Sequence, residues 1–455
     1  MKEYLSRFYI AQKYGNEMLI FSTLTTSLMI IPVEEYEAIY LKGNFNAFPE
    51  TVRNLIDNGF IHSEEFDELE YLESLRKKTI ANNSGKTNVF MITPTMDCNA
   101  RCFYCFERGS HHQKMTMDTA DAVSDFIANN KAEGTINLQW FGGEPLMATD
   151  VIDRICANLQ GRGIEYESKL TSNGYLFNET IFEKARDFWN VKYVQFTIDG
   201  LEDDYNRIKK YIYQNDPSPF ITVMNNIEKA ATFGYKIRLR LNFNPNETEK
   251  IKGLIVYLRK RFKQYNNLHV YFAGIDSTSN QIPPISLSFD EKKIHPIIEL
   301  LDIDESFCSM GSNNTAIDGI DSDLYTNILK DYFLHPITSS CFGVCRSSIS
   351  IDSLGDIYVC HRLLGQGKKM ASGSVFEGYK YNEITTCYQN TDIDEQCKQC
   401  NLLPLCQGGC KYKRLHYSKE HCCIPIKGVA ENMILRALQR YNAEQWEVNN
   451  ERIDR

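Results

Sequence analysis

Three cysteines lie close together near the N-terminal third of the chain, and their spacing suits a metal cluster. Cys98, Cys102 and Cys105 are separated by three and by two residues. Thiolates at this spacing can bind three irons of one four-iron cubane and leave the fourth iron open. A catalytic metal keeps such a vacant position for its substrate. The alternative is a partial zinc site with a distant fourth ligand, although zinc knuckles usually contain two Cys-x2-Cys pairs.

The segment around these cysteines, TPTMDCNARCFYCFE, resembles the cluster motif of radical S-adenosylmethionine (SAM) enzymes, including the aromatic Tyr104 before the third cysteine. The resemblance implies that the open iron chelates the amino and carboxylate groups of SAM. It also implies that an electron from the reduced cluster cleaves SAM and yields a 5'-deoxyadenosyl radical, which abstracts a substrate hydrogen. The protein would contribute positioning and the exclusion of water.

Further residues stand where that family binds SAM. In QWFGGEPL, Gly142 and Gly143 would let the backbone approach the ligand, and Glu144 could accept from its ammonium group. Ser172 and Asn173 are predicted to bond the ribose hydroxyls, and Arg240 is predicted to bind the carboxylate. Tyr104 and Thr197 are the other predicted cofactor contacts. Arg238 competes with Arg240, because period-two alternation puts both on one face of a strand. Asp199 is predicted to face the substrate cavity as a catalytic residue. The plainer interpretation of these segments is a set of strand-ending turns.

A second group of cysteines resembles the seven-cysteine SPASM pattern, which implies two auxiliary 4Fe–4S clusters and three clusters in all. The resemblance assigns Cys345, Cys360 and Cys410 to the first auxiliary cluster, with Cys341 as the fourth ligand. It assigns Cys397, Cys400 and Cys406 to the second, completed by Cys422 or Cys423. The alternative is a pair of structural zinc sites. Cys156 lies in an apolar helical pattern and is predicted to be a core residue.

His361 directly follows Cys360, at a position where relatives that form formylglycine in sulfatases carry a catalytic aspartate. We therefore include His361 among the candidate catalytic residues. The departure from aspartate weakens a sulfatase-maturing interpretation.

The composition is that of a folded protein whose cysteines serve metals. The chain has 455 residues, fifteen cysteines and a formal net charge of −9. This charge argues against a broad phosphate-binding face, so no nucleic-acid partner is predicted. The sequence contains no run of about eighteen apolar residues and no secretion signal, which predicts a cytoplasmic protein without a membrane partner. In the reducing cytosol, dense cysteines indicate metal sites before disulfides.

The elements that position these residues predict an α/β fold with a partial (β/α)6 radical SAM barrel. Six strands alternate with helices, at residues 89–95, 135–141, 166–172, 191–198, 235–243 and 268–274. The predicted domains are a winged-helix-like peptide-recognition module (1–85), the radical SAM core (86–285), a connector (286–340), a cysteine-rich SPASM domain (341–425) and a closing helix (426–455). Ligands of parallel sheets bind at the carboxyl ends of the strands, where the candidate residues lie.

Most relatives with this layout modify ribosomally made peptides, so the resemblance implies a peptide maturase that installs a thioether or carbon–carbon crosslink. The N-terminal module would hold the leader of the precursor peptide by pairing it with an edge strand. An electron donor such as flavodoxin or ferredoxin is the other implied partner. The alternatives are a formylglycine-forming sulfatase maturase and a non-catalytic iron–sulfur scaffold or redox sensor.

Overall fold

The computed structural model describes residues 3–83, 87–107, 112–243, 248–274, 347–390 and 393–416. Four predicted cluster ligands lie outside the described residues: Cys341, Cys345, Cys422 and Cys423. The predicted connector and closing helix also lie outside them.

The N-terminal module combines a small antiparallel sheet with short helices. Its strands are β1 (Glu3–Leu5), β2 (Tyr9–Tyr14), β3 (Glu17–Ser22), β4 (Leu28–Pro32) and β5 (Ile61–Ser63), and its helices are α1 (Val33–Tyr36), the π-helix η1 (Glu37–Leu41), α2 (Pro49–Asp57) and α3 (Glu68–Asn83). The sheet order is β2-β3-β4, while β1 pairs with β5. Ile20 of β3 packs against Ile39 and Leu55 in the core of the module. Proline at the first position of α2 starts that helix, as its fixed φ favours.

The central sheet contains the six predicted strands, all parallel to their neighbours in the order β11-β10-β9-β8-β7-β6. The strands are β6 (Val89–Ile92), β7 (Ile136–Trp140), β8 (Tyr166–Ser172), β9 (Val191–Ile198), β10 (Lys236–Phe243) and β11 (Leu268–Gly274). The connecting segments carry α4 (Met117–Asn130), η2 (Pro145–Ala148), α5 (Thr149–Gly161), α6 (Glu179–Asp187), α7 (Glu202–Lys209), α8 (Pro219–Phe233) and α9 (Thr248–Phe262). This arrangement confirms the predicted parallel α/β core, and it places the carboxyl ends of all six strands on one rim.

A hairpin from the C-terminal region extends this sheet beyond β6. Its strands are β12 (Ser348–Ile351) and β13 (Ile357–Tyr358), and β12 pairs in parallel with β6. The sequence analysis assigned these residues to a separate cysteine-rich domain. Their apolar side chains instead join the buried core of the parallel sheet. The first residues of the cysteine-rich region are therefore anchored to the strand that leads into the Cys98 loop.

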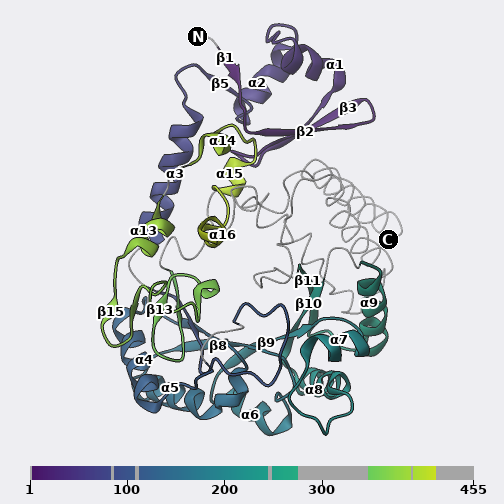
Figure 1. Cartoon of the computed structure of the whole chain (residues 1–455). Helices are drawn as coiled ribbons and strands as arrows, with labels where there is room; N and C mark the ends of the chain where they lie inside the picture. Colours follow the sequence, from purple (N-terminus) through teal and green to yellow (C-terminus); the bar gives the residue numbers. More distant parts are fainter. Residues whose placement is uncertain are drawn as a thin grey trace.

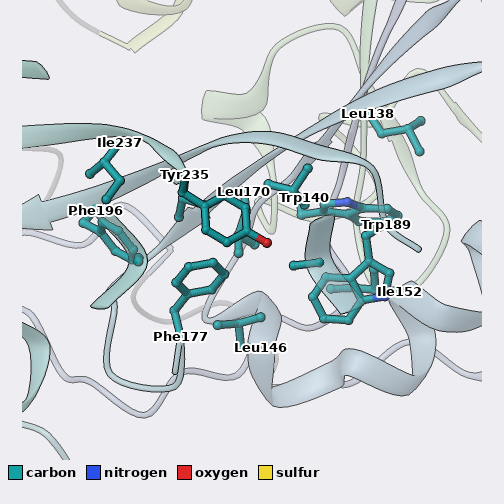
Figure 2. Packing of buried hydrophobic residues seen from close by; sticks show 14 of the residues in the cluster. Leu138, Trp140, Leu146, Ile152, Leu170, Phe177, Trp189, Phe196, Tyr235 and Ile237 are labelled. Carbon is teal, nitrogen blue, oxygen red and sulfur yellow. The ribbon is translucent and has the colours of Figure 1, made fainter. Parts of the chain in front are cut away.

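Large apolar side chains from the strands pack against those of the surrounding helices and loops (Figure 2). Trp140, Leu170 and Phe196 come from successive neighbouring strands, and each is fully buried. Trp189, which precedes β9, and Phe177, which precedes α6, cover them and are also fully buried. Close packing of this kind fixes the strand positions, and with them the loops at the carboxyl rim.

The remaining C-terminal region consists of short elements, in line with the prediction of few long periodic segments. These are η4 (His361–Leu363), β14 (Gly373–Ser374), β15 (Gly378–Tyr379), α13 (Glu383–Gln389), α14 (Glu395–Lys398), α15 (Leu403–Cys406) and α16 (Lys411–His416). Figure 1 shows α13 to α16 between the N-terminal module and the central sheet. None of the helices in the described part of the chain combines the length and apolar character needed to cross a membrane.

Candidate active site

The cysteine loop begins after β6 and is tied by backbone hydrogen bonds to the segment that ends α7. The Arg101 N–H donates to the Lys209 carbonyl at 2.7 Å. The Ile212 N–H donates to the Asn99 carbonyl at 2.9 Å. The thiols of the loop are therefore positioned by two stretches that are far apart in the sequence.

The three thiols of the loop are surrounded by protein and have raised pKa values. Burial, with nearby carboxylates adding to it, raises the pKa of Cys98 and of Cys105 to about 12. Burial also raises the pKa of Cys102. The thiols are therefore protonated at neutral pH unless a metal supplies positive charge. The Ala100 N–H lies 3.3 Å from Cys98 Sγ, which is the kind of hydrogen bond that tunes cluster sulfurs.

The donor set of the loop fits a cubane. Across the residues that the structure describes, no three His, Cys, Asp or Glu side chains lie close enough to share one metal ion. The ligands of a cubane need not lie that close to one another, because each thiolate binds a different iron. The three cysteines of the loop line one cavity, and their role as ligands of the cluster stays a prediction.

A cavity of about 260 Å³ lies beside the cysteine loop at the carboxyl ends of the strands. The three cysteines line it together with eight other predicted site residues: Tyr104, Gly142, Gly143, Ser172, Asn173, Thr197, Arg240 and His361. Glu144 and Asp199 are buried behind this lining. The structure therefore gathers the predicted residues of the loop, of the ends of four strands (β7 to β10) and of η4 around one space, where α/β sheets bind their ligands.

The two glycines after β7 are required by backbone packing against the cysteine loop. A Cβ on Gly143 would lie 2.0 Å from the Asp97 carbonyl oxygen, and one on Gly142 would lie 2.2 Å from Thr93 Cγ2. Gly142 also has a φ of 112°, which residues with a side chain rarely adopt. The sequence analysis gave the glycines the role of admitting the ligand. The structure adds that both glycines also leave room for the backbone segment that leads into Cys98.

We expect Gly143→Ala to displace this backbone, because the new methyl group would overlap the Asp97 carbonyl. The free energy of unfolding should fall by about 1–3 kcal/mol, and the iron bound at the loop should fall with it. Thermal unfolding and iron content of anaerobically purified protein measure both effects. The matched control is Gly161→Ala at the end of α5, where a Cβ would meet no atom within 4 Å. Indistinguishable stability and iron content in the two variants would contradict this packing role.

Glu144 links the ends of β7 and β8. Its carboxylate accepts from the Ser172 hydroxyl at 2.9 Å and from the Asn173 N–H at 2.8 Å. Burial raises the pKa of Glu144 to about 7, although these hydrogen bonds oppose the shift. The Asn173 side chain donates to Asn99 Oδ1 at 2.6 Å. The predicted ribose contacts therefore already bond within the protein, and their roles toward SAM stay predictions.

Asp199 does not line the cavity, because Tyr104, Lys209 and Asn242 surround its carboxylate. The Tyr104 hydroxyl lies 2.8 Å from both carboxylate oxygens, and Asn242 Nδ2 donates to Oδ1 at 2.9 Å. Lys209 Nζ forms an ion pair with Oδ2 at 3.0 Å. The side chains of Lys209 and Asp199 are 3% and 0% exposed. Direct contact of Asp199 with a substrate, as the sequence analysis expected, would require this network to open.

Sequence reasoning missed Lys209, which adds a cation to the cavity lining. Burial by itself would lower the pKa of Lys209, but Asp199, Tyr104 and Cys102 together raise it well above its usual value. Lys209 therefore stays charged. Nothing in the sequence distinguished it from the solvated charges elsewhere on its helix. Asn242 was missed too, although its place in β10, two residues after Arg240, would have identified it.

The structure distinguishes the two candidate arginines of β10. Arg240 lines the cavity, and its Nε donates to Asn242 Oδ1 at 3.0 Å. Arg238 is exposed, and its guanidinium carbon lies 4.9 Å from the centre of the Tyr193 ring. Both arginines share a strand face, as predicted, but Arg240 lies nearer the carboxyl rim. Arg240 is thus the arginine available to a ligand of the cavity.

Part of the cavity lining is aromatic, and it comes from the cysteine loop, the end of β7 and the C-terminal region. The ring of His361 lies 6.0 Å from that of Phe141 and 6.5 Å from that of Phe106, edge to face in both pairs. Burial, followed by the charges of Arg362 and Arg240, lowers the pKa of His361 to about 4, so the imidazole is neutral at pH 7. Nothing in the sequence pattern indicated that the rings of Phe106 and Phe141 would lie against that of His361.

Glu107 also lines the cavity and was missed, although it directly follows the cysteine motif. It is 7% exposed, and its Oε1 has no hydrogen-bond partner in the described structure. Burial raises the pKa of Glu107 to about 8.

Five of the predicted auxiliary ligands lie within the described residues. Burial raises the pKa of Cys360, and the charge of Cys410 adds to the shift, so these two predicted partners lie within electrostatic reach. The other three, Cys397, Cys400 and Cys406, occupy α14, α15 and the turn between them, where the Cys400 N–H donates to the Cys397 carbonyl at 3.0 Å. Cys156 is fully buried in the core, which confirms its predicted place.

Comparison with known proteins agrees with this geometry. Residues 92–256 match the model of the radical SAM superfamily. A cysteine-type anaerobic sulfatase-maturating enzyme of Clostridium perfringens is 24% identical over 345 residues, which cover 71% of this chain and 88% of that enzyme. A radical SAM cyclopropyl synthase, TigE, of Paramaledivibacter caminithermalis is 20% identical over 95% of this chain and 96% of the synthase.

The solved structure of Streptococcus suis SuiB bound to its precursor peptide SuiA has a similar fold, with a TM-score of 0.53 and 14% identity. The similarity covers 93% of this chain and 99% of SuiB, so it includes the N-terminal module as well as the sheet.

Proposed function

This chain belongs to the radical SAM superfamily, and from that premise we propose that it is a maturase of a ribosomally made peptide. The observation that carries the proposal is the single cavity that joins the cysteine loop and the strand ends to an aromatic wall built partly by the C-terminal region. One side of this cavity suits SAM, and the other is open to an apolar or aromatic part of a substrate. Proteins similar to this chain include a sulfatase-maturating enzyme and a structure bound to a precursor peptide.

The cofactor and its cluster supply the radical that takes a hydrogen atom from the substrate. The residues of this chain would orient SAM and exclude water around it. Arg240 and Lys209 line the cavity and would provide positive charge for the carboxylate of SAM. Glu144 lies behind the lining with a pKa raised to about 7, and it would accept from the amino group of SAM once it is ionised. Because these charges are held by hydrogen bonds before the ligand arrives, little reorganisation accompanies binding.

The N-terminal module is proposed to hold the leader of the peptide. Its sheet has two edge strands among the described elements, because β2 and β4 each pair only with β3. Leu28 and Ile30 of β4 are 44% and 43% exposed, so the edge strand carries two apolar side chains on its outer face. An extended peptide could add a strand to such an edge and pack beside these side chains. Tethering the leader would raise the effective concentration of the modified segment at the cavity.

The finer chemistry proposed is a thioether or carbon–carbon crosslink, with two auxiliary clusters that accept the remaining electron or hold the peptide. A flavodoxin or ferredoxin would reduce the first cluster. Similarity to the sulfatase-maturating enzyme favours formylglycine formation as the second candidate. The neutral His361 beside Cys360 argues against it, because the resemblance places a catalytic aspartate at this position.

Anaerobic turnover tests the proposal directly. With SAM and dithionite under argon, the purified enzyme should release 5'-deoxyadenosine, whereas an iron–sulfur scaffold would release none. Coexpression with the short peptides encoded beside its gene should yield one peptide that has lost a pair of hydrogen atoms, detected by mass spectrometry. Release of 5'-deoxyadenosine with no change in any such peptide, but with formylglycine in a coexpressed sulfatase, would favour the second candidate. Absence of both products would refute a maturase.

A further inference from the structure

The N-terminal module rests on the segment that carries Cys397, Cys400 and Cys406. The Thr23 hydroxyl donates to the Asn401 carbonyl, and Asn401 Nδ2 donates in turn to the Tyr9 carbonyl at 3.1 Å. Figure 1 shows α14 and α15 beside α3 and the strands of the module. Asn401 lies between the second and third of these cysteines, so the module contacts the cysteine segment itself.

An apolar cluster also joins the N-terminal module to the cysteine segment. Phe8, Leu24 and Leu72 of the module are buried together with Leu403 of α15, and Cys397 packs against the cluster. A second apolar cluster, separate from the core of the module, therefore covers the cysteine segment. Shielding of this kind lowers the local dielectric and strengthens the effect of nearby charges.

Two arginines approach the cysteines in this shielded place. Arg414 Nη2 lies 3.5 Å from Cys397 Sγ, and Nη1 of the same guanidinium pairs with Asp394. Arg76 of α3 is 7% exposed, and its Nη2 donates to the Gln407 carbonyl at 3.4 Å, next to Cys406. Burial lowers the pKa of Arg76; Glu73 and Cys406 oppose that shift, and the charge of Arg414 adds to it. Both arginines therefore bring positive charge to the proposed cluster ligands, where an anionic cluster would be stabilised by it.

We propose that Arg76 and Arg414 are positioning residues for the second auxiliary cluster and that their positive charge favours its reduced state. Because Arg76 belongs to α3, the N-terminal module is then a structural part of this cluster site. The inference rests on the proposed auxiliary cluster of Cys397, Cys400 and Cys406. It goes beyond a leader-binding role, because it assigns the module a charge that acts on the cluster.

Reduction adds one negative charge to a cluster that is already anionic, so a nearby fixed cation stabilises the reduced state more than the oxidised state. A unit charge roughly 10 Å away in an effective dielectric of about 20 changes the ratio of the two states by about tenfold. For a one-electron couple this corresponds to about 59 mV. By linkage, reduction of the cluster should also tighten the docking of the module.

The test is a redox titration followed by electron paramagnetic resonance under argon, in a full-length background in which Cys98, Cys102 and Cys105 are alanine. This background removes the signal of the first cluster. Arg76→Met removes the buried cation. Lys77→Met is the matched control on the same helix, because the Lys77 side chain is 64% exposed and its charge is screened by solvent. Arg76→Lys keeps the charge.

We expect Arg76→Met to lower the reduced fraction of one auxiliary cluster about tenfold at fixed potential, while Lys77→Met and Arg76→Lys leave it within about twofold. Loss of iron from that cluster alone, rescued by Arg76→Lys, would also support the proposal. Full iron content with an unchanged potential in Arg76→Met would overturn it, as would equal shifts in Arg76→Met and Arg76→Lys. A background protein without any iron–sulfur signal would instead refute the proposed auxiliary clusters themselves.

Discussion

Replacement of Cys98, Cys102 and Cys105 by alanine should abolish release of 5'-deoxyadenosine, a loss of at least ~10³-fold, because these cysteines are the proposed ligands of the cluster that binds SAM. The iron content should fall by about four per chain, which is one cubane. Anaerobic turnover with SAM and dithionite, together with iron analysis, measures both quantities. The auxiliary clusters should remain, since their predicted ligands lie in the C-terminal region.

Cys156→Ala is the matched control for this experiment. Its thiol is fully buried in the core and does not line the cavity, so the variant should keep its iron and its turnover while losing a little stability. Retained turnover in the triple variant would refute the proposed reaction. Zinc in place of iron in the purified wild-type protein would refute the cluster.

Lys209→Met should destabilise the protein by about 3 kcal/mol, because it leaves the buried Asp199 carboxylate without its ion-pair partner. The two side chains are almost fully shielded from water, and their atoms are 3.0 Å apart. The hydrogen bonds from Tyr104 and Asn242 to the same carboxylate should limit the loss. Thermal unfolding under argon measures the effect. The variant should also bind SAM more weakly, since one of the cations that line the cavity is removed.

Arg207→Met, two residues earlier on α7, is the control for Lys209→Met. Its ion pair with Asp204 is solvent-exposed, so its loss should change stability by no more than about 0.5 kcal/mol. In the double variant Lys209→Met with Asp199→Asn, the loss should be smaller than in Lys209→Met alone, because the uncompensated charge is gone. A Lys209→Met protein as stable as the wild type would show that Asp199 is satisfied without the lysine.

The sequence predicted the six parallel strands to within three residues at either end, because each is a short apolar or alternating segment between helical patterns. It also predicted which loops carry the site, since parallel strands present their carboxyl ends on one rim. The spacing of Cys98, Cys102 and Cys105 predicted the cluster loop, and the structure places these cysteines in the lining of the cavity at that rim. The prediction of the N-terminal sheet followed from the same kind of local pattern.

Local patterns did not reveal which charges are buried. Lys209 and Lys210 are adjacent on the chain, yet Lys209 is buried against Asp199 while Lys210 is exposed, because the left-handed backbone at Lys210 ends the helix there. The alternation of side chains along β10 puts Arg238 and Arg240 on the same face of the strand. Only Arg240 lies near the carboxyl end, where the cavity is. The requirement for glycine at Gly143 depends on the Asp97 carbonyl, which reaches it through strand pairing.

The sequence by itself thus determined the element types, the cluster motif and the superfamily, because these depend on spacing within short segments. Only the tertiary structure decided that the hairpin of β12 and β13 extends the parallel sheet, that His361 meets Phe141, and that Arg76 reaches the Cys406 segment. Each of these contacts joins residues from distant parts of the chain. Their geometry is fixed by how the apolar faces pack together, which no local spacing encodes.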